Sequence, residues 1–350
     1  MELDLNFWKN KKVFLTGHTG FKGTWLSLIL ESLGAKLHGY SLKPDTKPSF
    51  FESISFDGFS TIGDIRDYDT LKKTITKFEP EIIIHMAAQP LVRLSYDDPV
   101  GTYGTNVLGL VNLLDVAKTC RSLKAILNVT SDKCYENKEW LWGYRENDRL
   151  GGHDPYSNSK ACAELVTNSF LKSYFHELKV GLATARAGNV IGGGDWSSDR
   201  LIPDYIRAQQ SQSSLEIRSP NSIRPWQHVL EPITGYLKLV ELLYHDPAQF
   251  SEPWNFGPKD NDVITVREVI EELQSQASQK VNVVYQNDET KHEASLLKLD
   301  PTKSNKRLNW SSQLNIHEAV KYTLNWYDSF YNNRNMTEVT MRQFSDYLKM

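Results

Sequence analysis

Short hydrophobic runs alternate with longer amphipathic stretches through the first half of the chain. A run at residues 12–16 precedes an amphipathic stretch at 24–33, and a second run follows at 36–40. This order predicts a strand, a helix and a parallel strand, which together form a βαβ unit. Further elements are expected as strands at 82–86, 125–130 and 180–185 and as a helix at 106–118. The pattern predicts an α/β fold with a doubly wound parallel sheet, whose binding sites lie at the carboxyl ends of the strands.

The pattern changes after Arg186. Residues 188–195 are rich in glycine, and prolines punctuate the part that follows, at Pro203, Pro220, Pro225, Pro232, Pro247 and Pro253. Helices are still predicted, at 204–210, 233–244, 266–276 and 316–331. We expect residues 1–186 to form the sheet domain, with 227–250 returning to it. Residues 187–226 and 251–350 are expected to form a smaller, mixed α/β lobe that completes a cleft and binds the substrate.

Composition excludes several classes of protein. The 350 residues are 40% hydrophobic and 24% charged, and the net charge is -3 without a basic run, so neither nucleic acid nor an anionic membrane is an expected partner. The start of the chain has no basic region or apolar signal core, and no span approaches transmembrane length, which favours the cytoplasm. The cysteines number 3 and contain no Cys-x-x-Cys pair, and the 9 histidines contain no His-Glu-x-x-His, so we expect reduced thiols and no catalytic metal.

A glycine-rich loop follows the first predicted strand, with the sequence Gly17-His18-Thr19-Gly20-Phe21-Lys22-Gly23. A loop of this kind between a strand and a helix is typical of dinucleotide-binding sheets, often called Rossmann folds. The first glycine allows a tight turn, the second lets the backbone approach a pyrophosphate, and the third lets helix and strand pack closely. All seven residues are therefore candidates for binding a dinucleotide, whose charge would face the free amides of the helix.

Other parts of the predicted cofactor site are less distinctive. An acid for the ribose hydroxyls is expected after the second strand, but no acid occurs there before Asp45, so this position does not decide between NAD and NADP. Asp64 and Ile65 are placed for an adenine contact, although Asp64 suits a turn or helix cap equally well. Small residues end a central strand, and the remaining candidates for the cofactor are Ala87, Ala88, Gln89, Asn106, Tyr156 and Lys160.

Tyr156 and Lys160 are four residues apart and share one face of a predicted helix. Chance alone supplies one or two such pairs in a chain of this composition, so the spacing needs its context. A phenol acts as a base at neutral pH only if positive charge favours the phenolate, which Lys160 and an oxidised nicotinamide would provide. Ser131 ends the preceding strand and could bond to the same substrate hydroxyl. This set suits hydride transfer from a sugar alcohol.

Four separated motifs carry a family resemblance, at residues 17–25 (GHTGFKGTW), 130–137 (TSDKCYEN), 185–196 (ARAGNVIGGGDW) and 224–228 (RPWQH). With Tyr156 and Lys160 they resemble the extended short-chain dehydrogenase/reductase family, and within it the nucleotide-sugar 4,6-dehydratases that act on CDP-glucose. The resemblance extends from Lys11 to about Trp310. It implies NAD as cofactor, CDP-D-glucose as substrate, a homodimer or dimer of dimers, and a role in the deoxysugars of bacterial surface polysaccharide.

The resemblance also implies a reaction without net redox change. Hydride leaves C4 of the sugar for NAD, water is lost across C5 and C6, and the same hydride returns to C6. Asp132 would protonate the departing C6 hydroxyl, which requires a protonated carboxyl. Lys133 replaces the glutamate that serves as C5 base in dehydratases of dTDP-glucose. It must either act as a neutral base or stabilise the enolate, and the sequence does not separate these roles.

Substrate contacts are expected from residues near the other strand ends. Arg200 and Arg224 are candidates for the diphosphate, because guanidinium geometry matches it. The other candidates are Gln89, Arg93, Asn189 and Trp226. The alternative functions are a dehydratase for another nucleotide, a 4-epimerase, which needs neither Asp132 nor Lys133, and a dinucleotide-sensing protein without activity.

Overall fold

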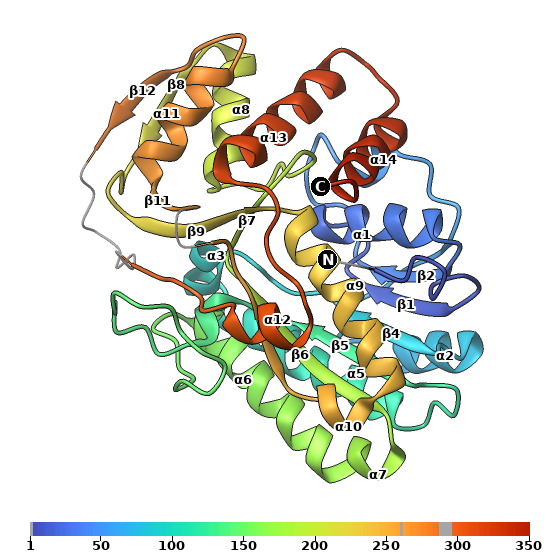
Figure 1. Ribbon diagram of the computed structural model, residues 1–350. Helices are drawn as coiled ribbons and strands as arrows, with labels where there is room; N and C mark the ends of the chain where they lie inside the picture. Colours follow the sequence, from blue (N-terminus) through green and yellow to red (C-terminus); the bar gives the residue numbers. More distant parts are fainter. Residues whose placement is uncertain (1–2, 260–261, 287–295) are drawn as a thin grey trace.

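A sheet of seven parallel strands is the largest element of the computed structural model, which describes residues 3–259, 262–286 and 296–350 (Figure 1). The strands run in the order β10 (Pro253–Phe256), β6 (Gly181–Ala187), β5 (Ala125–Val129), β4 (Ile82–His85), β1 (Lys12–Thr16), β2 (Lys36–Ser41) and β3 (Phe59–Ile62). The order reverses between β1 and β4, which is the point where doubly wound sheets bind their ligands. The predicted fold class is confirmed.

Alternate strand residues supply two hydrophobic cores, one on each face of the sheet. Phe14 and Ile83 pack on one face, whereas Leu15 and Ile84 pack on the other. The first face is covered by α2 (Tyr68–Phe78), α5 (Gly109–Ala117) and α6 (Pro155–Phe170), and the second by α1 (Phe21–Ser32) and α9 (Leu230–His245). Because both faces are buried, the strands read as nearly continuous apolar runs.

Local sequence explains where the helices next to the site begin. Gly20 precedes α1 and offers no side-chain cap, so the first amides of this helix have no side-chain partner there. Asp154 caps α6 by accepting a hydrogen bond from the Ser157 amide, and Pro155 takes the first helical position. The cap thereby places Tyr156 in the first turn of α6, directly above the strand ends.

The helix predicted at 106–118 begins earlier, at Pro99. It consists of α4 (Pro99–Tyr103), a π-helical turn (Gly104–Leu108) and α5, and a second π-helical turn (Leu171–Phe175) continues α6 into α7 (His176–Leu178). The glycines at 101, 104 and 109 weaken the helical signal in this part of the sequence. Gly109 is needed for packing, since a Cβ there would lie 2.5 Å from Ile65.

Smaller elements build the lobe above the sheet. A three-stranded sheet joins β11 (Val263–Thr265), β9 (Ile223–His228) and β7 (Asn189–Ile191), and β12 (Asn282–Tyr285) pairs with β8 (Ser214–Ile217). The remaining helices of the described chain are α3 (Val92–Asp97), α8 (Leu201–Ser211), α10 (Pro247–Phe250), α11 (Val266–Gln276), α12 (Thr302–Arg307), α13 (Ile316–Tyr331) and α14 (Met336–Tyr347). Two 3-10 turns are also present, η1 (Phe51–Ser53) and η3 (Asp132–Cys134).

The chain returns to the large sheet further than we expected, because β10 at 253–256 forms its edge beside β6. The helix α14 also packs against α1 of the sheet domain. The lobe boundaries otherwise stay a prediction.

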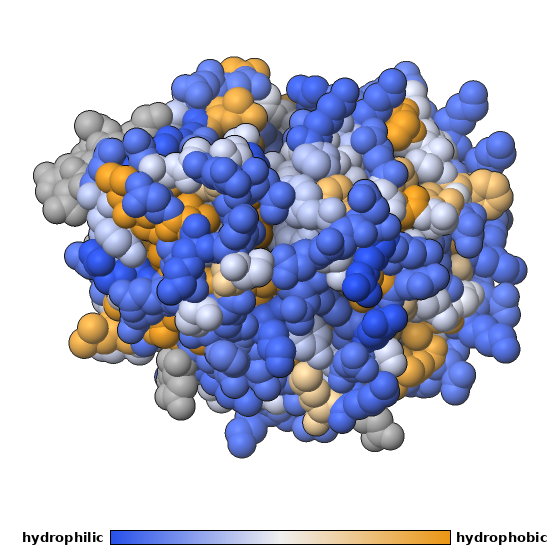
Figure 2. All heavy atoms as spheres, turned by 90° about the horizontal axis from the view of Figure 1, so that it is seen from above, coloured by the Kyte–Doolittle hydropathy of each residue, from blue (hydrophilic) through white to orange (hydrophobic). Residues whose placement is uncertain are grey.

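The face seen from above is largely hydrophilic, with apolar residues in separate patches (Figure 2). None of the helices in the described ranges is long and apolar enough to cross a membrane.

Candidate active site

A cavity of about 950 Å³ lies at the carboxyl ends of the central strands and extends under the smaller lobe. Its walls come from the segments after β4, β5 and β6 and from α8 and β8. The volume is at the upper end of the range for small-molecule sites, which suits an extended ligand. The cavity is lined by these candidates: Phe21, Lys22, Ala88, Arg93, Ser131, Asp132, Lys133, Tyr156, Lys160, Asn189, Arg200, Arg224 and Trp226.

The glycine loop has the shape that a dinucleotide needs. Gly17 has φ +77°, and a Cβ there would lie 2.8 Å from the Ala87 amide nitrogen. A Cβ on Gly23 would lie 2.0 Å from the Gly17 carbonyl oxygen, so helix and loop meet at contact distance. A Cβ on Gly20 would meet only the Gly17 oxygen, at 3.5 Å, which leaves open space above the amides of α1. A pyrophosphate fits this cradle.

The His18 and Thr19 side chains of the loop bond to the segments of β2 and β3. The His18 ring is buried, its Nε2 is 2.8 Å from Ser60 Oγ, and burial lowers its pKa to about 4. Thr19 donates to the Leu42 carbonyl at 2.9 Å. These residues shape the loop and present their backbone to a ligand, whereas Phe21 and Lys22 reach the cavity with their side chains.

Four candidates for the cofactor have side chains that are buried or bonded to other residues, with the Asp64 pair at the surface. The Asp64 carboxylate accepts bonds from Arg66, with one contact of 2.5 Å, and Ile65 is buried. The Gln89 amide donates to Thr102 Oγ1 at 2.8 Å, and Asn106 Oδ1 accepts from the Gln89 backbone at 2.8 Å. Gln89 and Asn106 therefore support the loop after β4, and their contact with a ligand stays a prediction.

Ser131 and Asp132 lie together at the end of β5. Ser131 Oγ donates to Asp132 Oδ1 at 2.9 Å and accepts from the Lys133 amide at 3.2 Å. Asp132 is 2% exposed, and its Oδ2 has no hydrogen-bond partner among the described residues. An unpartnered carboxylate oxygen on a cavity wall is available to a ligand hydroxyl. Lys133 is half-buried and lines the same wall.

Tyr156 and Lys160 occupy successive turns of α6 and face this wall. Burial raises the pKa of Tyr156 to about 12, while a hydrogen bond with Ser131 opposes the rise. Burial lowers the pKa of the Lys160 ammonium to about 8, opposed by Glu164 and Cys134. The Lys160 ammonium also donates to the Val129 carbonyl at 3.4 Å. The predicted hydroxyl, phenol, amine and acid are thus brought to one wall.

A second group of charged side chains, Lys22, Asp195 and Arg200, also lines the cavity. Arg200 Nη1 is 2.9 Å from Asp195 Oδ2, and although burial acts against it, this pairing raises the Arg200 pKa. Lys22 is half-buried, and burial together with Lys160 and Arg200 lowers its pKa to about 8. These cations suit an anionic ligand such as a diphosphate.

The remaining substrate candidates border the lobe. Arg93 is 3.3 Å from Asp199 at an exposed edge, and Arg224 is buried with its guanidinium bonded to the Ile223 carbonyl at 2.9 Å. Asn189 starts β7 beside Trp226 of β9, and the Trp226 indole nitrogen is buried without a partner among the described residues. No group of three or more metal-ligating side chains occurs in the described part of the chain.

Sequence reasoning missed two charged residues of this region. Asp195 was noticed only as part of a motif, and nothing in the sequence identified it as the partner of Arg200. Glu164 was not considered, although it continues the four-residue spacing of Tyr156 and Lys160 along one helix face.

Comparison with known proteins agrees with this geometry. A sequence model of the GDP-mannose 4,6 dehydratase family matches residues 14–323. A CDP-glucose 4,6-dehydratase from Salmonella typhimurium LT2 is 49% identical over 353 residues, which cover 99% of this chain and 98% of that protein. A human dTDP-D-glucose 4,6-dehydratase is 26% identical, with 93% of each chain covered.

Solved structures show the same fold. An epimerase from Methanothermobacter thermautotrophicus is 22% identical and covers 95% of this chain and 96% of its own, with a TM-score of 0.81. A dTDP-glucose 4,6-dehydratase from Bacillus anthracis in complex with NAD is 21% identical and covers 93% of this chain and 99% of its own, with a TM-score of 0.74. On the match over most of its length, the chain belongs to the GDP-mannose 4,6 dehydratase family, a nucleotide-sugar dehydratase group of the extended short-chain dehydrogenases/reductases.

Proposed function

We propose that this chain is a CDP-glucose 4,6-dehydratase, a hydro-lyase that holds NAD and regenerates it in every turnover. One observation carries the proposal: Asp132 and Lys133 line the same cavity as Ser131, Tyr156 and Lys160. A dehydrogenase or epimerase needs only the last three, whereas a dehydratase also needs an acid and a base. The 49% identity to the Salmonella enzyme supports CDP-glucose as the substrate, and the product would be CDP-4-keto-6-deoxy-D-glucose.

The first step is oxidation at C4. Ser131 and Tyr156 hold the C4 hydroxyl, and the Tyr156 phenolate accepts its proton. With a pKa of about 12 the phenol needs nearby positive charge before it ionises at neutral pH, and Lys160 lies one turn away to supply part of it. Bound NAD supplies hydride acceptance at C4 and hydride donation at C6. The residues expected to hold it are the glycine loop, Asp64, Ile65, Ala87, Ala88, Gln89, Asn106, Tyr156 and Lys160.

The second step is elimination of water. A carbonyl at C4 acidifies the C5 proton, so an otherwise unreactive C–H bond can be broken. Lys133, on the wall beside Asp132, removes that proton as a neutral amine, or it stays an ammonium and stabilises the enolate while another group accepts the proton. Asp132 protonates the departing C6 oxygen through Oδ2, the oxygen that has no partner among the described residues. Asp132 is left as a carboxylate and takes up a proton before the next turnover.

Binding of the nucleotide falls to the cationic side of the cavity. Arg200 and Arg224 are assigned to the diphosphate, with Lys22 beside Arg200. Asn189, Trp226 and Arg93 border the rest of the ligand.

We place the enzyme in the cytoplasm, where free thiols such as its three cysteines stay reduced.

We further propose a homodimer, or a dimer of dimers, built on helices of the sheet domain. Apolar side chains are exposed on two neighbouring helical segments: Val100 is 82% exposed, Leu108 61% and Leu165 57%. The segment of α4 and its π-helical turn packs along α6, so the three side chains belong to one side of the molecule. Apolar groups gathered in this way indicate a surface that is covered in solution.

The test is product formation from four nucleotide sugars. Purified protein loaded with NAD is incubated separately with CDP-glucose, dTDP-glucose, UDP-glucose and GDP-mannose, and products are identified by mass spectrometry and NMR. The proposal predicts a 4-keto-6-deoxy sugar from CDP-glucose at the highest kcat/KM. A 4-epimer, or a preference for another nucleotide, would contradict it. Tyr156→Phe serves as the inactive control.

A further inference from the structure

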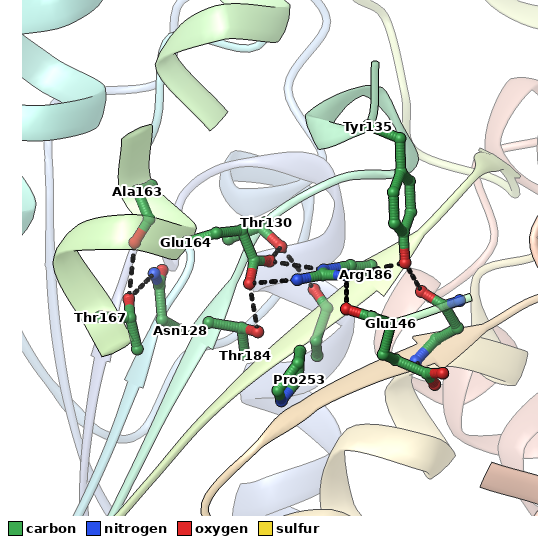
Figure 3. A network of polar contacts seen from close by, with 12 residues as sticks. Asn128, Thr130, Tyr135, Glu146, Ala163, Glu164, Thr167, Thr184, Arg186 and Pro253 are labelled. Atoms are coloured by element: carbon green, nitrogen blue, oxygen red, sulfur yellow. Dashed lines mark hydrogen bonds and ion pairs between the residues drawn. The ribbon is translucent and has the colours of Figure 1, made fainter. Parts of the chain in front are cut away.

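Glu164 forms the centre of a buried polar network directly behind the catalytic wall (Figure 3). It lies on α6, one turn after Lys160 and two turns after Tyr156. Thr130 donates to its Oε1 and Thr184 donates to its Oε2 at 2.7 Å. The carboxylate thus joins the helix that carries the phenol and amine to two adjacent strands, β5 and β6.

Arg186 completes this attachment with two further bonds. Its Nε and Nη2 donate to Glu164 Oε1 and Oε2 at 2.9 and 2.7 Å, and both side chains are 3% exposed or less. Arg186 Nη1 donates to Tyr135 Oη at 2.7 Å, and Tyr135 follows η3, which contains Asp132 and Lys133. A bidentate pair of this kind fixes both position and orientation. The network therefore touches every segment that supplies a catalytic group.

Thr130 is the direct link to the reaction, because it precedes Ser131 in the chain. A shift of Thr130 relative to α6 would change the distance between Ser131 and Tyr156, which must meet on one substrate hydroxyl. Mispositioning of a catalytic group by about 1 Å lowers rates by about two orders of magnitude. Glu164 restrains this shift from the helix side.

The Lys160 ammonium faces charged and titratable groups on several elements. On its own helix Glu164 favours its protonated form, and Cys134 of η3 would do so only as a thiolate. Lys22 of α1 is a neighbouring cation, and the His85 ring of β4 is buried, with its pKa lowered by burial and by Lys160 to about 3, so it is neutral. Cys134 is buried, which raises the pKa of its thiol and leaves it neutral as well. Glu164 is thus the acidic side chain that acts on Lys160 among these groups.

We propose that Glu164 is a positioning residue for the redox step, which holds the end of β5 against α6 and supplies the negative charge that keeps Lys160 an ammonium. The inference rests on the proposed role of Tyr156 and Lys160 in oxidation at C4. Glu164 is buried, does not line the cavity, and has both carboxylate oxygens bonded within the protein, so we place it out of contact with substrate and cofactor. It acts through Lys160 and through Thr130.

Removing the charge changes the titration of Lys160 in a fixed direction. Glu164 raises the pKa of Lys160, so Glu164→Gln lowers it from about 8. The ammonium is then lost at lower pH, and the alkaline limb of the kcat profile moves down with it. Loss of a neighbouring opposite charge shifts a pKa by about one pH unit or more. A role confined to stability would lower activity without moving this limb.

The experiment measures Lys160 itself as well as turnover. Trace acetic anhydride acylates the neutral amine only, and the pH dependence of Lys160 labelling, read by peptide mass spectrometry, reports its pKa in the protein without added cofactor. Glu164→Gln is compared with Glu146→Gln, which makes the same change to a half-buried carboxylate in a residue whose backbone carbonyl accepts a bond from Arg186. We expect the labelling midpoint to fall by about one pH unit in the first variant and to stay in place in the second.

Two further variants keep the test decisive. Glu164→Gln leaves the Arg186 charge buried without an opposite charge, which threatens folding. The double variant Glu164→Gln/Arg186→Gln removes both charges and should show the same shift of the Lys160 labelling midpoint. Thr130→Val and Thr184→Val each remove one bond to Glu164 and keep its charge. We expect at least a tenfold loss of kcat for Thr130→Val, a smaller loss for Thr184→Val, and no shift of the midpoint in either.

An unchanged Lys160 midpoint in folded Glu164→Gln and in the double variant would overturn the charge role. Equal kcat losses for the two threonine variants would overturn the link to Ser131. Both failures are distinguishable from failure of the proposed function, because labelling of Lys160 needs no substrate. If wild type did not turn over CDP-glucose, the labelling result would stand on its own.

Discussion

Replacing Asp132 by Asn should separate oxidation from elimination. The amide has nearly the same shape, and its oxygen can still accept the 2.9 Å bond from Ser131. The second oxygen has no partner among the described residues, so no native contact is lost there. We therefore expect the free energy of unfolding to change by less than about 1.5 kcal/mol. The variant should fold and bind its ligands.

The chemical consequence is much larger than the change in stability. An amide cannot donate a proton to the departing C6 oxygen, and loss of a general acid costs about 10²- to 10⁴-fold in rate. This corresponds to about 3–5 kcal/mol of barrier. Oxidation at C4 does not use Asp132, so the enzyme should complete that step and then stall with reduced cofactor bound.

Single-turnover absorbance at the reduced nicotinamide band measures the stalled state. Wild type should show a transient, whereas Asp132→Asn should show a persistent signal and slow product release. Asp195→Asn is the matched control, because it changes another acid of the cavity that pairs with Arg200. It should raise KM without accumulating reduced cofactor. Full turnover by Asp132→Asn would refute its role as the acid.

Three further outcomes follow. Tyr156→Phe should abolish reduction of bound NAD by CDP-glucose, measured by absorbance, and a wild-type rate would remove Tyr156 from the mechanism. Burial raises the pKa of Glu231 from 4.5 to about 7, so the folded protein retains a proton that the unfolded chain releases, and stability falls as pH rises through this range. The free energy of unfolding falls by about 3 kcal/mol over this range. Glu231→Gln should abolish the fall, measured by melting curves at several pH values, and should keep a bond to Tyr347. An unchanged dependence of stability on pH in this variant would contradict the assignment. Leu165→Glu should halve the particle mass measured by light scattering, whereas the control Leu141→Glu, on an exposed loop, should leave it unchanged. An unchanged mass for Leu165→Glu would exclude this dimer surface.

The sheet was predictable because its signals are local. Each buried strand is an apolar run, and Gly17 and Gly23 are required by contacts within the loop itself. The strands of the lobe gave no such signal. β9 contains Pro225 and the charged Arg224, and it is a strand because it pairs with β7 and β11, which are remote in sequence. Pairing between distant segments is invisible to a periodicity argument.

The catalytic wall was predicted more fully than the ligand contacts. Ser131, Asp132 and Lys133 directly follow β5, and Tyr156 lies in the first turn of a capped helix, so local rules place them at one edge of the sheet. Gln89 illustrates the limit, because its amide donates to Thr102 of α4. Which partner a polar side chain selects depends on packing that no spacing rule describes.

Transfer of deuterium within the sugar tests the central claim most directly. CDP-glucose carrying deuterium at C4 is converted by the NAD-loaded enzyme in ordinary water, and the product is examined by NMR and mass spectrometry. The account predicts a 4-keto-6-deoxy product with the deuterium at C6, because the hydride that leaves C4 returns to the same sugar. A 4-keto-6-deoxy product without deuterium at C6, or recovery of the label at C4 of an epimer, would contradict it.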